Sequence, residues 1–378
     1  MFAHYFTIES KQRSTGALGQ PSDFTLAPAE TVDAAIILSD PNLSLYCFDD
    51  EARQAIFVEL PPDVDLSTVG FVYQTQYDQA RRVLAISYED FHALARQLPP
   101  VEHLIMIYIS GRSGSTLLSN VFNQLDSVMS LSEPDAGTQL HHLRRPDGSR
   151  DAELRELLAS MMRILFRPTP FKPRPTTCVL KLRSEALQII DLFQAEFPAA
   201  TNLYSYRDCI GFVRSFYRIF TRDGFAKPTP VDRFFASYSR LLETDVHHLR
   251  ACLDPGISEI TVVQRLALWW LANTEVYLAK AAQGFPFLAV RYADLTASRE
   301  QVLNAIFAYC GLPTDRVAET LVAFERDSQA GTFLARDNPA EGNPLQLTDA
   351  QIEEINQLLQ RHPVIRMADF IVPNTLII

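Results

Sequence analysis

The sequence predicts an α/β fold in which a central parallel sheet lies between layers of helices, preceded by a small α+β extension. Short apolar runs rich in β-branched and aromatic residues recur after residue 100, as expected for strands buried on both faces. Segments with helical spacing of apolar residues separate these runs. Because Pro99-Pro100 interrupts the pattern, we expect an extension over residues 1–100 and a main domain over residues 101–378.

Within the extension, residues 1–35 are expected to be a loop or partly ordered arm, since proline, glycine and serine interrupt them. Two short strands are expected at 43–48 and 55–60, separated by an acidic turn. Residues 72–98 mix near-helical spacing with a strand-like stretch at 86–88.

The main domain begins with a strand at residues 104–109, followed by a small-residue loop over 110–115 and a helix that starts at Ser115. A loop that enters a helix N-terminus presents free backbone N–H groups and the positive end of the helix dipole. The loop is therefore expected to bind an anion, with an ordinary strand-to-helix turn as the alternative. It lacks the Gly-Lys-Ser/Thr ending of nucleoside-triphosphate loops, and Arg112 carries the nearby positive charge.

The rest of the main domain continues the alternation of strands and helices. Strands are expected at 128–131, 178–183, 202–206 and 287–292. Helices are expected at 151–166, 184–194, 231–250, 259–283 and 299–310, with one more between 348 and 378.

The composition argues against several classes of protein. The net charge is −11, which does not suit general binding of nucleic acid or of anionic membranes. Residues 111–222 nevertheless carry a local charge of +4. No apolar run approaches 18 residues and the first residues lack a secretion signal, so no membrane span is expected. Five dispersed cysteines indicate reduced thiols and a cytoplasmic protein.

Three further positions stand out by their place in the pattern. Lys181 lies in an apolar strand, where burial is costly unless its ammonium reaches an anion or the strand end. Arg207 leaves the next strand, and Ser215 lies eight positions later on a helix. Glu133 follows the strand at 128–131, at the sheet edge where open parallel sheets bind ligands.

Residues 111–118, Gly-Arg-Ser-Gly-Ser-Thr-Leu-Leu, resemble the 5′-phosphosulfate loop of sulfotransferases that use 3′-phosphoadenosine 5′-phosphosulfate (PAPS). The form is closer to that of tyrosylprotein sulfotransferases and many bacterial homologues than to that of cytosolic enzymes. The strand-Tyr-Arg-Asp segment at 206–208 with a helical serine resembles the family's 3′-phosphate site, and Arg-Tyr-Ala-Asp-Leu at 291–295 resembles another family segment. The resemblance covers residues 101 to about 335 and implies a P-loop-like fold.

The resemblance also implies roles for individual residues. Arg207 would grip the 3′-phosphate and Ser215 would donate a hydrogen bond to it. Lys181 is similar to a family lysine that contacts the leaving phosphate or the sulfuryl group. The residues implied to bind the 5′-phosphate are Arg112, Ser113, Gly114, Ser115, Thr116 and Leu117.

Glu133 is the first choice for the catalytic base, because it follows Ser113 by 20 residues, the spacing of the catalytic glutamate in tyrosylprotein sulfotransferases. Asp135 is the second choice. Sulfuryl transfer needs a base on one side and fixed positive charge on the other, and here Arg112 and Lys181 supply the charge. The flanking residues differ from those of tyrosylprotein sulfotransferases, which argues against a peptide acceptor.

The expected reaction is in-line sulfuryl transfer from PAPS to a hydroxyl of a small-molecule or lipid-like acceptor, which leaves adenosine 3′,5′-bisphosphate (PAP). Overall acidity does not suit a polyanionic glycan. For the extension, the candidate roles are plain packing, shaping of the acceptor site and a homodimer contact. The segment 327–332 resembles a loop that closes over the cofactor in bacterial homologues, with Arg336 as its basic residue.

Two alternatives stay open. A P-loop nucleotide-dependent kinase shares the strand-loop-helix cradle, although a loop lysine and a metal-binding carboxylate after a strand are missing. A catalytically silent nucleotide-binding protein would keep the same site. No metal is expected, since the adjacent His141 and His142 lack the spacing of helical metal ligands.

Overall fold

The structure is a computed structural model that describes residues 1–14, 16–222, 227–332, 334–335 and 346–378, and the side chains of 220–222 are not described. The chain divides into two compact units. The first comprises Met1–Met106, Thr116–Thr201 and Glu319–Thr332, and the second comprises Ile107–Ser115, Asn202–Ala318 and Phe333–Ile378.

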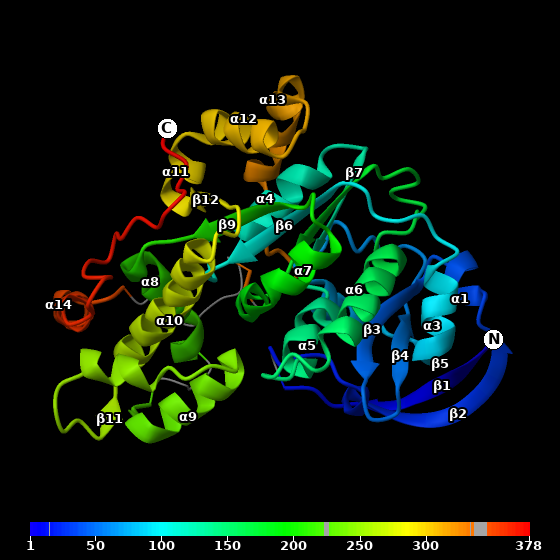
Figure 1. Ribbon diagram of the computed structural model, residues 1–378, viewed down its shortest axis with the longest axis horizontal. Helices are drawn as coiled ribbons and strands as arrows, with labels where there is room; N and C mark the ends of the chain where they lie inside the picture. The colour runs from blue at the N-terminus through cyan, green and yellow to red at the C-terminus, as the bar shows by residue number, and fades with distance from the viewer. Residues whose placement is uncertain (15, 223–226, 333, 336–345) are drawn as a thin grey trace. The chain divides into compact units, whose positions relative to one another are not determined.

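The N-terminal elements form a five-stranded antiparallel sheet of their own, in the order β2-β1-β5-β4-β3 (Figure 1). Its elements are β1 (Phe2–Lys11), β2 (Phe24–Asp33), α1 (Ile36–Ser39), β3 (Leu43–Asp49), β4 (Gln54–Glu59), α2 (Val72–Gln79), β5 (Arg82–Ser87) and α3 (Tyr88–Ala95). The expected strands at 43–48 and 55–60 are confirmed, whereas the expected loop over 1–35 is wrong. Pairing across β1 and β2 orders this segment, in a register with two irregularities.

The central sheet is five-stranded and parallel, in the order β12-β9-β6-β8-β7, and helices flank it (Figure 1). The predicted fold class is therefore confirmed. Its strands are β6 (Leu104–Ile109), β7 (Val128–Ser132), β8 (Thr177–Lys181), β9 (Thr201–Tyr206) and β12 (Leu288–Arg291). The expected strands all occur, and β8 ends at Lys181 rather than at residue 183.

The first unit also contains helices that follow strand β6 in the chain. These are α4 (Ser115–Asn123), α5 (Asp135–Leu143), α6 (Asp151–Leu165) and α7 (Ile190–Glu196). The first residue of α4, Ser115, is assigned to the second unit. Helices α5 and α6 contact β3, whose residues are buried except for the half-buried Asp49. The boundary at residue 100 stays a prediction, although residues 1–95 build a separate sheet with its own apolar cluster around Tyr46, Val58 and Val83.

Helices dominate the second unit. They are α8 (Cys209–Arg222), α9 (Val231–Leu242), α10 (Val262–Ala282), α11 (Tyr292–Ala297), α12 (Arg299–Tyr309) and α14 (Asp349–Gln360), with the short strands β10 (Thr229–Pro230) and β11 (Glu259–Ile260). Helix α13 (Val317–Thr320) begins in the second unit and ends in the first. The apolar core lies among α8, α9, α10 and α14, and Phe212, Phe235 and Trp270 are buried in it. The helix expected over 231–250 ends at Leu242, because Glu243 takes a left-handed backbone with φ 47°.

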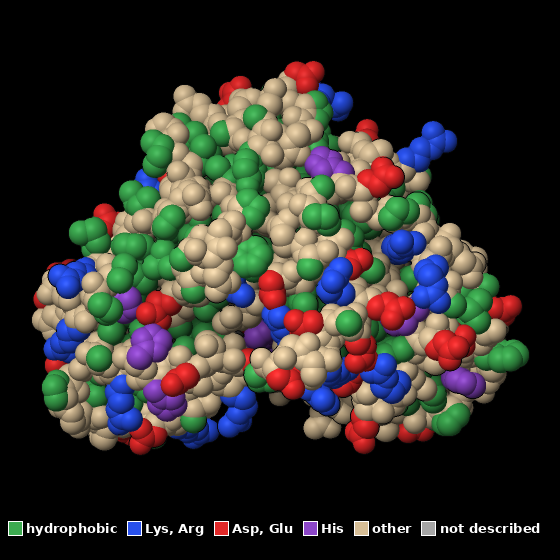
Figure 2. Space-filling view, viewed as in Figure 1, with side chains coloured by type: hydrophobic (Ala, Val, Ile, Leu, Met, Phe, Trp, Pro, Cys, Tyr) green, Lys and Arg blue, Asp and Glu red, His purple; other side chains and the backbone are tan. Residues whose placement is uncertain are grey.

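Surface charges are mixed rather than segregated. On the face shown in Figure 2, acidic and basic side chains are interspersed. Ion pairs among the described residues include Arg144 with Asp151 and Asp191, and Arg150 with Asp50. None of the helices in the described part of the chain has the length and apolarity needed to cross a membrane.

Candidate functional site

The loop after β6 has the backbone geometry of an anion cradle. Gly111, Arg112 and Gly114 have positive φ angles of 88°, 53° and 80°, and Ser115 begins α4. Successive N–H groups in such a turn face a common point, and the helix N-terminus adds its dipole. An arginine in this region costs about 1–2 kcal/mol relative to ordinary backbone, so the surrounding structure must impose the conformation.

Close packing within the second unit holds the loop in place. A Cβ atom on Gly114 would lie 2.6 Å from the Tyr292 ring, so glycine is required there for space as well as for φ. The Ser205 hydroxyl donates to the Ser113 carbonyl at 2.8 Å. The Ser113 hydroxyl is buried and lacks a hydrogen-bond partner among the described residues. A buried hydroxyl of this kind fits a bound oxyanion, because unsatisfied polar groups are costly.

Two sequence-distant motifs meet at Arg112. Its Nε donates to the Ser215 hydroxyl on α8 at 2.8 Å, although the two residues are 103 positions apart. Arg207 Nη1 donates to the Arg112 carbonyl at 3.4 Å. The second unit therefore brings together three of the residues that the sequence selected for cofactor binding.

Arg207 is held in position but not fully satisfied. The Trp270 indole donates to its carbonyl at 2.8 Å, and its guanidinium lies 4.5 Å from the centre of the Tyr292 ring. Its Nε is buried and has no hydrogen-bond partner in the described parts of the chain. Burial lowers the pKa of Arg207 from its ordinary value. An anion bound here would offset that cost of burial and would accept hydrogen bonds from the guanidinium, including one from Nε.

In the first unit, Lys181 and Glu133 form a buried ion pair. Lys181 Nζ lies 2.5 Å from Glu133 Oε1, and the two side chains are 1% and 11% exposed. The ammonium also donates to the hydroxyls of Thr116 at 3.1 Å and Ser132 at 3.2 Å. The Phe71 ring lies 5.2 Å from Nζ. Lys181 thus lies at the end of its strand and its ammonium contacts an anion, so the expected cost of burying a lysine is offset.

The backbone of Glu133 is unusual. It has a φ of 56°, its N–H donates to the Lys181 carbonyl at 2.7 Å, and its carbonyl accepts from the Tyr73 N–H at 3.3 Å. A left-handed non-glycine residue is strained, and such strain concentrates at functional sites. Glu133 is therefore fixed on both sides by strand β8 and by the start of α2.

Asp135, the second candidate base, is fully buried and occupied. It accepts from Arg183 Nε at 2.9 Å, from Arg13 Nη2 at 2.5 Å and from the Gly19 N–H at 2.7 Å. Burial raises the pKa of Asp135, and the two guanidinium groups oppose that shift. Three donors thus already contact Asp135, and its place as the second choice for the base stays a prediction.

The remaining predicted residues lie where the loop enters α4. Ser115 and Thr116 are buried, and Leu117 is half-buried. The segment 327–332 forms turns in the first unit, where a Cβ atom on Gly70 would lie 2.9 Å from Thr332 Cγ2. Arg336 lies outside the described residues.

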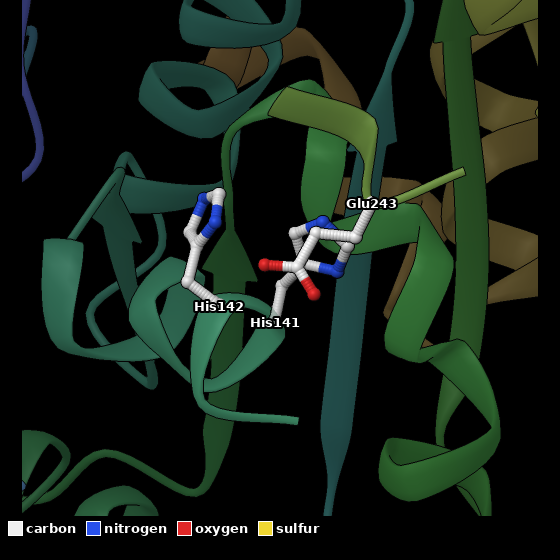
Figure 3. A group of neighbouring side chains, drawn as sticks. All are labelled: His141, His142 and Glu243. Atoms are coloured by element: carbon white, nitrogen blue, oxygen red, sulfur yellow. The ribbon is translucent and has the colours of Figure 1, made fainter. Parts of the chain in front are cut away.

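The two adjacent histidines lie on α5, as Figure 3 shows. The ring centres of His141 and His142 are 4.8 Å apart, with an angle of 66° between the ring planes. Glu243, also labelled there, belongs to the second unit, where it follows α9. The expectation that no metal binds rests on the sequence argument and stays a prediction.

Several site residues escape a reading of the sequence. Phe71, Tyr73 and Arg13 come from the extension, and no local motif marks them. Arg183 carries a weak signal, since it follows Lys181 by two positions and alternate residues of a strand point to one face. Tyr292, which belongs to the Arg-Tyr-Ala-Asp-Leu segment, contacts the guanidinium of Arg207.

Solved structures with low similarity to this chain include two sulfotransferases and retinol dehydratase. The sulfotransferase domain from the curacin biosynthetic pathway is 16% identical, with a TM-score of 0.40, and the alignment covers 73% of this chain and 95% of that domain. Sulfotransferase STF9 from Mycobacterium avium is 13% identical, with a TM-score of 0.38 and coverage of 73% and 81%. Retinol dehydratase, solved with androsterone and the inactive cofactor PAP, is 13% identical, with a TM-score of 0.35 and coverage of 76% and 88%.

Curated proteins show no significant sequence match to the chain. The sequence profile of the sulfotransferase family, however, matches residues 105–316. This range is more than half of the 378 residues and contains the cradle loop, Glu133, Lys181 and the Arg207 motif. The chain therefore belongs to the sulfotransferase family.

Proposed function

We propose that this protein transfers the sulfuryl group of PAPS to a hydroxyl of a small-molecule or lipid-like acceptor, with Glu133 as the base. The observation that carries the proposal is the group formed by Arg112, Arg207 and Ser215. In this group the buried Arg207 Nε has no hydrogen-bond partner among the described residues, and the left-handed backbone of the cradle loop suits a bound phosphate. Family membership supports sulfotransferase activity in general. The donor, the acceptor and the base are the parts that we propose.

The residues fit a nucleotide with phosphates at the 5′ and 3′ positions. The 5′-phosphate would be held by Arg112, by the loop N–H groups and by the hydroxyls of Ser113, Ser115 and Thr116. Leu117 would contribute its backbone N–H. The 3′-phosphate would be held by Arg207 and Ser215. PAPS supplies an activated sulfuryl group on its 5′-phosphate.

Glu133 would accept the proton of the acceptor hydroxyl as the new oxygen–sulfur bond forms. Negative charge would then develop on the leaving phosphate, where Lys181 and Arg112 would stabilise it. Thr116 directly follows Ser115 of the loop, and its hydroxyl accepts a hydrogen bond from Lys181 Nζ at 3.1 Å.

The proposed class of acceptor rests on the charge of the protein. An acidic protein with a net charge of −11 is poorly suited to a polyanionic glycan. A neutral hydroxylated molecule avoids this repulsion. Androsterone, present in the retinol dehydratase structure, is a molecule of that kind bound by another protein.

The first test is calorimetric binding of PAP, adenosine 5′-monophosphate and ATP to the wild type and to Arg207→Ala. We expect PAP to bind at least 100-fold more tightly than adenosine 5′-monophosphate, because a charged fork on a phosphate contributes a few kcal/mol. The Arg207→Ala variant should lose most of this preference. Arg218→Ala, another arginine of α8, is the matched control.

Equal binding of the three nucleotides would contradict the proposal. A preference for ATP with magnesium would instead favour the nucleotide-dependent kinase. Tight PAP binding without turnover of PAPS, over a panel of phenols, alcohols and sterols, would favour the silent nucleotide-binding protein.

A further inference from the structure

Arg13 lies outside the residues matched by the family, yet it contacts the segment that carries Glu133. Its side chain is 5% exposed and Asp135 is 0% exposed, with 2.5 Å between Nη2 and Oδ2. Asp23 is a second buried carboxylate, 3.8 Å from Nε. A buried arginine that reaches across 122 sequence positions marks a specific junction between the extension and the start of α5.

The hydrogen bonds of Arg13 close a ring around Glu133. Arg13 Nη1 donates to the Tyr73 carbonyl at 3.3 Å, and the Tyr73 N–H donates to the Glu133 carbonyl at 3.3 Å. From Glu133 the chain continues through Pro134, whose φ is −69°, to Asp135, which returns to Arg13. Because proline restricts the backbone between the two carboxylates, the position of Asp135 helps to set that of Glu133.

Arg183 completes the enclosure from the other side. Its Nε donates to Asp135 Oδ1 at 2.9 Å, its Nη2 lies 2.7 Å from the same oxygen, and its guanidinium carbon lies 4.1 Å from the centre of the Tyr73 ring. It also donates to the carbonyls of Gly16 and Ala17, so the segment after Arg13 is held on the same cluster. Two guanidinium groups thus fix one carboxylate, and each also contacts Tyr73.

We propose that Arg13 is a positioning residue of this enzyme: it fixes the Tyr73 and Asp135 ends of the turn and so holds Glu133 in its left-handed conformation beside Lys181. The proposal rests on the proposed function, in which Glu133 is the base. It gives the extension a role in the reaction beyond packing. Geometry favours arginine over lysine, because the guanidinium reaches four acceptors, on Ala17, Tyr46, Tyr73 and Asp135, whereas an ammonium has three donors.

The test that does not depend on catalysis is amide hydrogen exchange of the full chain. In Arg13→Gln we expect exchange at the amides of Glu133 and Tyr73 to rise at least tenfold, with little change in β9 or α10. Arg96→Gln is the matched control, since Arg96 is an exposed arginine of the same extension paired with Glu156. If Arg13→Gln does not fold, Arg13→Lys carries the test, with a smaller rise expected.

Unchanged exchange at Glu133 and Tyr73 would overturn the proposal. So would a uniform rise over the whole first unit, because that result would indicate a purely structural ion pair. Only a rise confined to the two sides of the turn supports positioning.

Kinetics then separate this proposal from the proposed function. PAP formation from PAPS, with phenols and alcohols as probe acceptors, should show a kcat at least tenfold lower in Arg13→Gln and a Kd for PAP within twofold of wild type. The double variant Arg13→Gln/Glu133→Gln should be no slower than Glu133→Gln alone, since Arg13 acts through Glu133. Full additivity would overturn the proposal. A fully active Glu133→Gln would overturn the assignment of the base, whatever the exchange data show.

Discussion

At the scale of single residues, the Lys181–Glu133 pair combines stability and chemistry. Two opposite charges are held 2.5 Å apart with little exposure to water. Buried pairs contribute little net stability, but removal of one partner leaves an uncompensated charge. The same two groups are proposed to move a proton and to stabilise a leaving phosphate.

This arrangement predicts an asymmetric mutational response. Lys181→Met should lower the free energy of unfolding by about 3–5 kcal/mol, because Glu133 loses its counter-charge. The double variant Lys181→Met/Glu133→Gln should recover at least half of this loss, since no buried charge remains. Chemical denaturation followed by circular dichroism measures both. Equal stability of the two variants would contradict the expected coupling.

At the scale of elements, the strand-loop-helix unit from β6 to α4 follows closely from its sequence. An apolar strand, a small-residue turn and helical spacing are local signals, and the structure reproduces their boundaries within one residue. Glycine is needed at position 114 for two separate reasons, a φ of 80° and the nearby Tyr292 ring.

The two reasons can be separated with a pair of glycine substitutions. Gly284, which follows α10, has a φ of 89°, and a Cβ atom added there would meet no neighbouring atom within 4 Å. Gly284→Ala should therefore lower the free energy of unfolding by about 1–2 kcal/mol, the cost of a left-handed backbone at a residue with a Cβ atom. Gly114→Ala should cost more and should also weaken PAP binding, because the Tyr292 ring must move. Thermal unfolding and calorimetry of both variants test this, and equal costs would indicate that the ring yields freely.

Elements whose pairing is long-range are predicted less well. Strands β1 and β2 were expected as a loop, because Pro21, Pro28 and several glycine, serine and threonine residues interrupt residues 1–35. Their order comes from pairing with each other and with β5, which no local pattern encodes. The helix starting at Val231 was expected to run past its real end because the left-handed backbone at Glu243 leaves no mark in the apolar spacing.

At the scale of the whole molecule, the sequence predicts the fold class and the motif residues of the candidate site, but it does not predict the residues that surround Glu133. Loop motifs identify Arg112, Arg207 and Ser215, and the structure brings these three together within the second unit. The surroundings of Glu133 depend on Arg13, Phe71 and Tyr73, which lie far away in the chain. Contacts over such separations arise from the tertiary fold, so a single sequence does not reveal them.

Acid stability is a property of the whole molecule that one cluster helps to set. Glu275 on α10 accepts from His248 at 2.8 Å and from His362 at 2.9 Å, and these hydrogen bonds lower its pKa against the opposing effect of burial. A carboxylate whose folded pKa lies below its unfolded value stabilises the fold above the unfolded value. This stabilisation is lost as pH falls through the folded value.

We therefore expect part of the stability to disappear below about pH 4.5, the ordinary pKa of this carboxyl. Glu275→Gln should be less stable than wild type at pH 7, with a difference that shrinks toward pH 3. The exposed Glu259→Gln in β11 is the control. Melting temperatures measured from pH 3 to 7 decide the matter, and parallel curves for Glu275→Gln and wild type would refute the expectation.

The ring through Arg13 also determines which changes this chain can tolerate as it diverges. Ala17 takes part only through its carbonyl, and Tyr73 contributes its backbone N–H and carbonyl as well as its ring. A change of side chain at position 17 should therefore leave these hydrogen bonds in place, whereas an insertion or deletion between Arg13 and Gly19 should displace the Gly16 and Ala17 carbonyls and the Gly19 N–H. We therefore expect relatives that share the mechanism to preserve the length of this segment, even where side chains such as that of Ala17 differ.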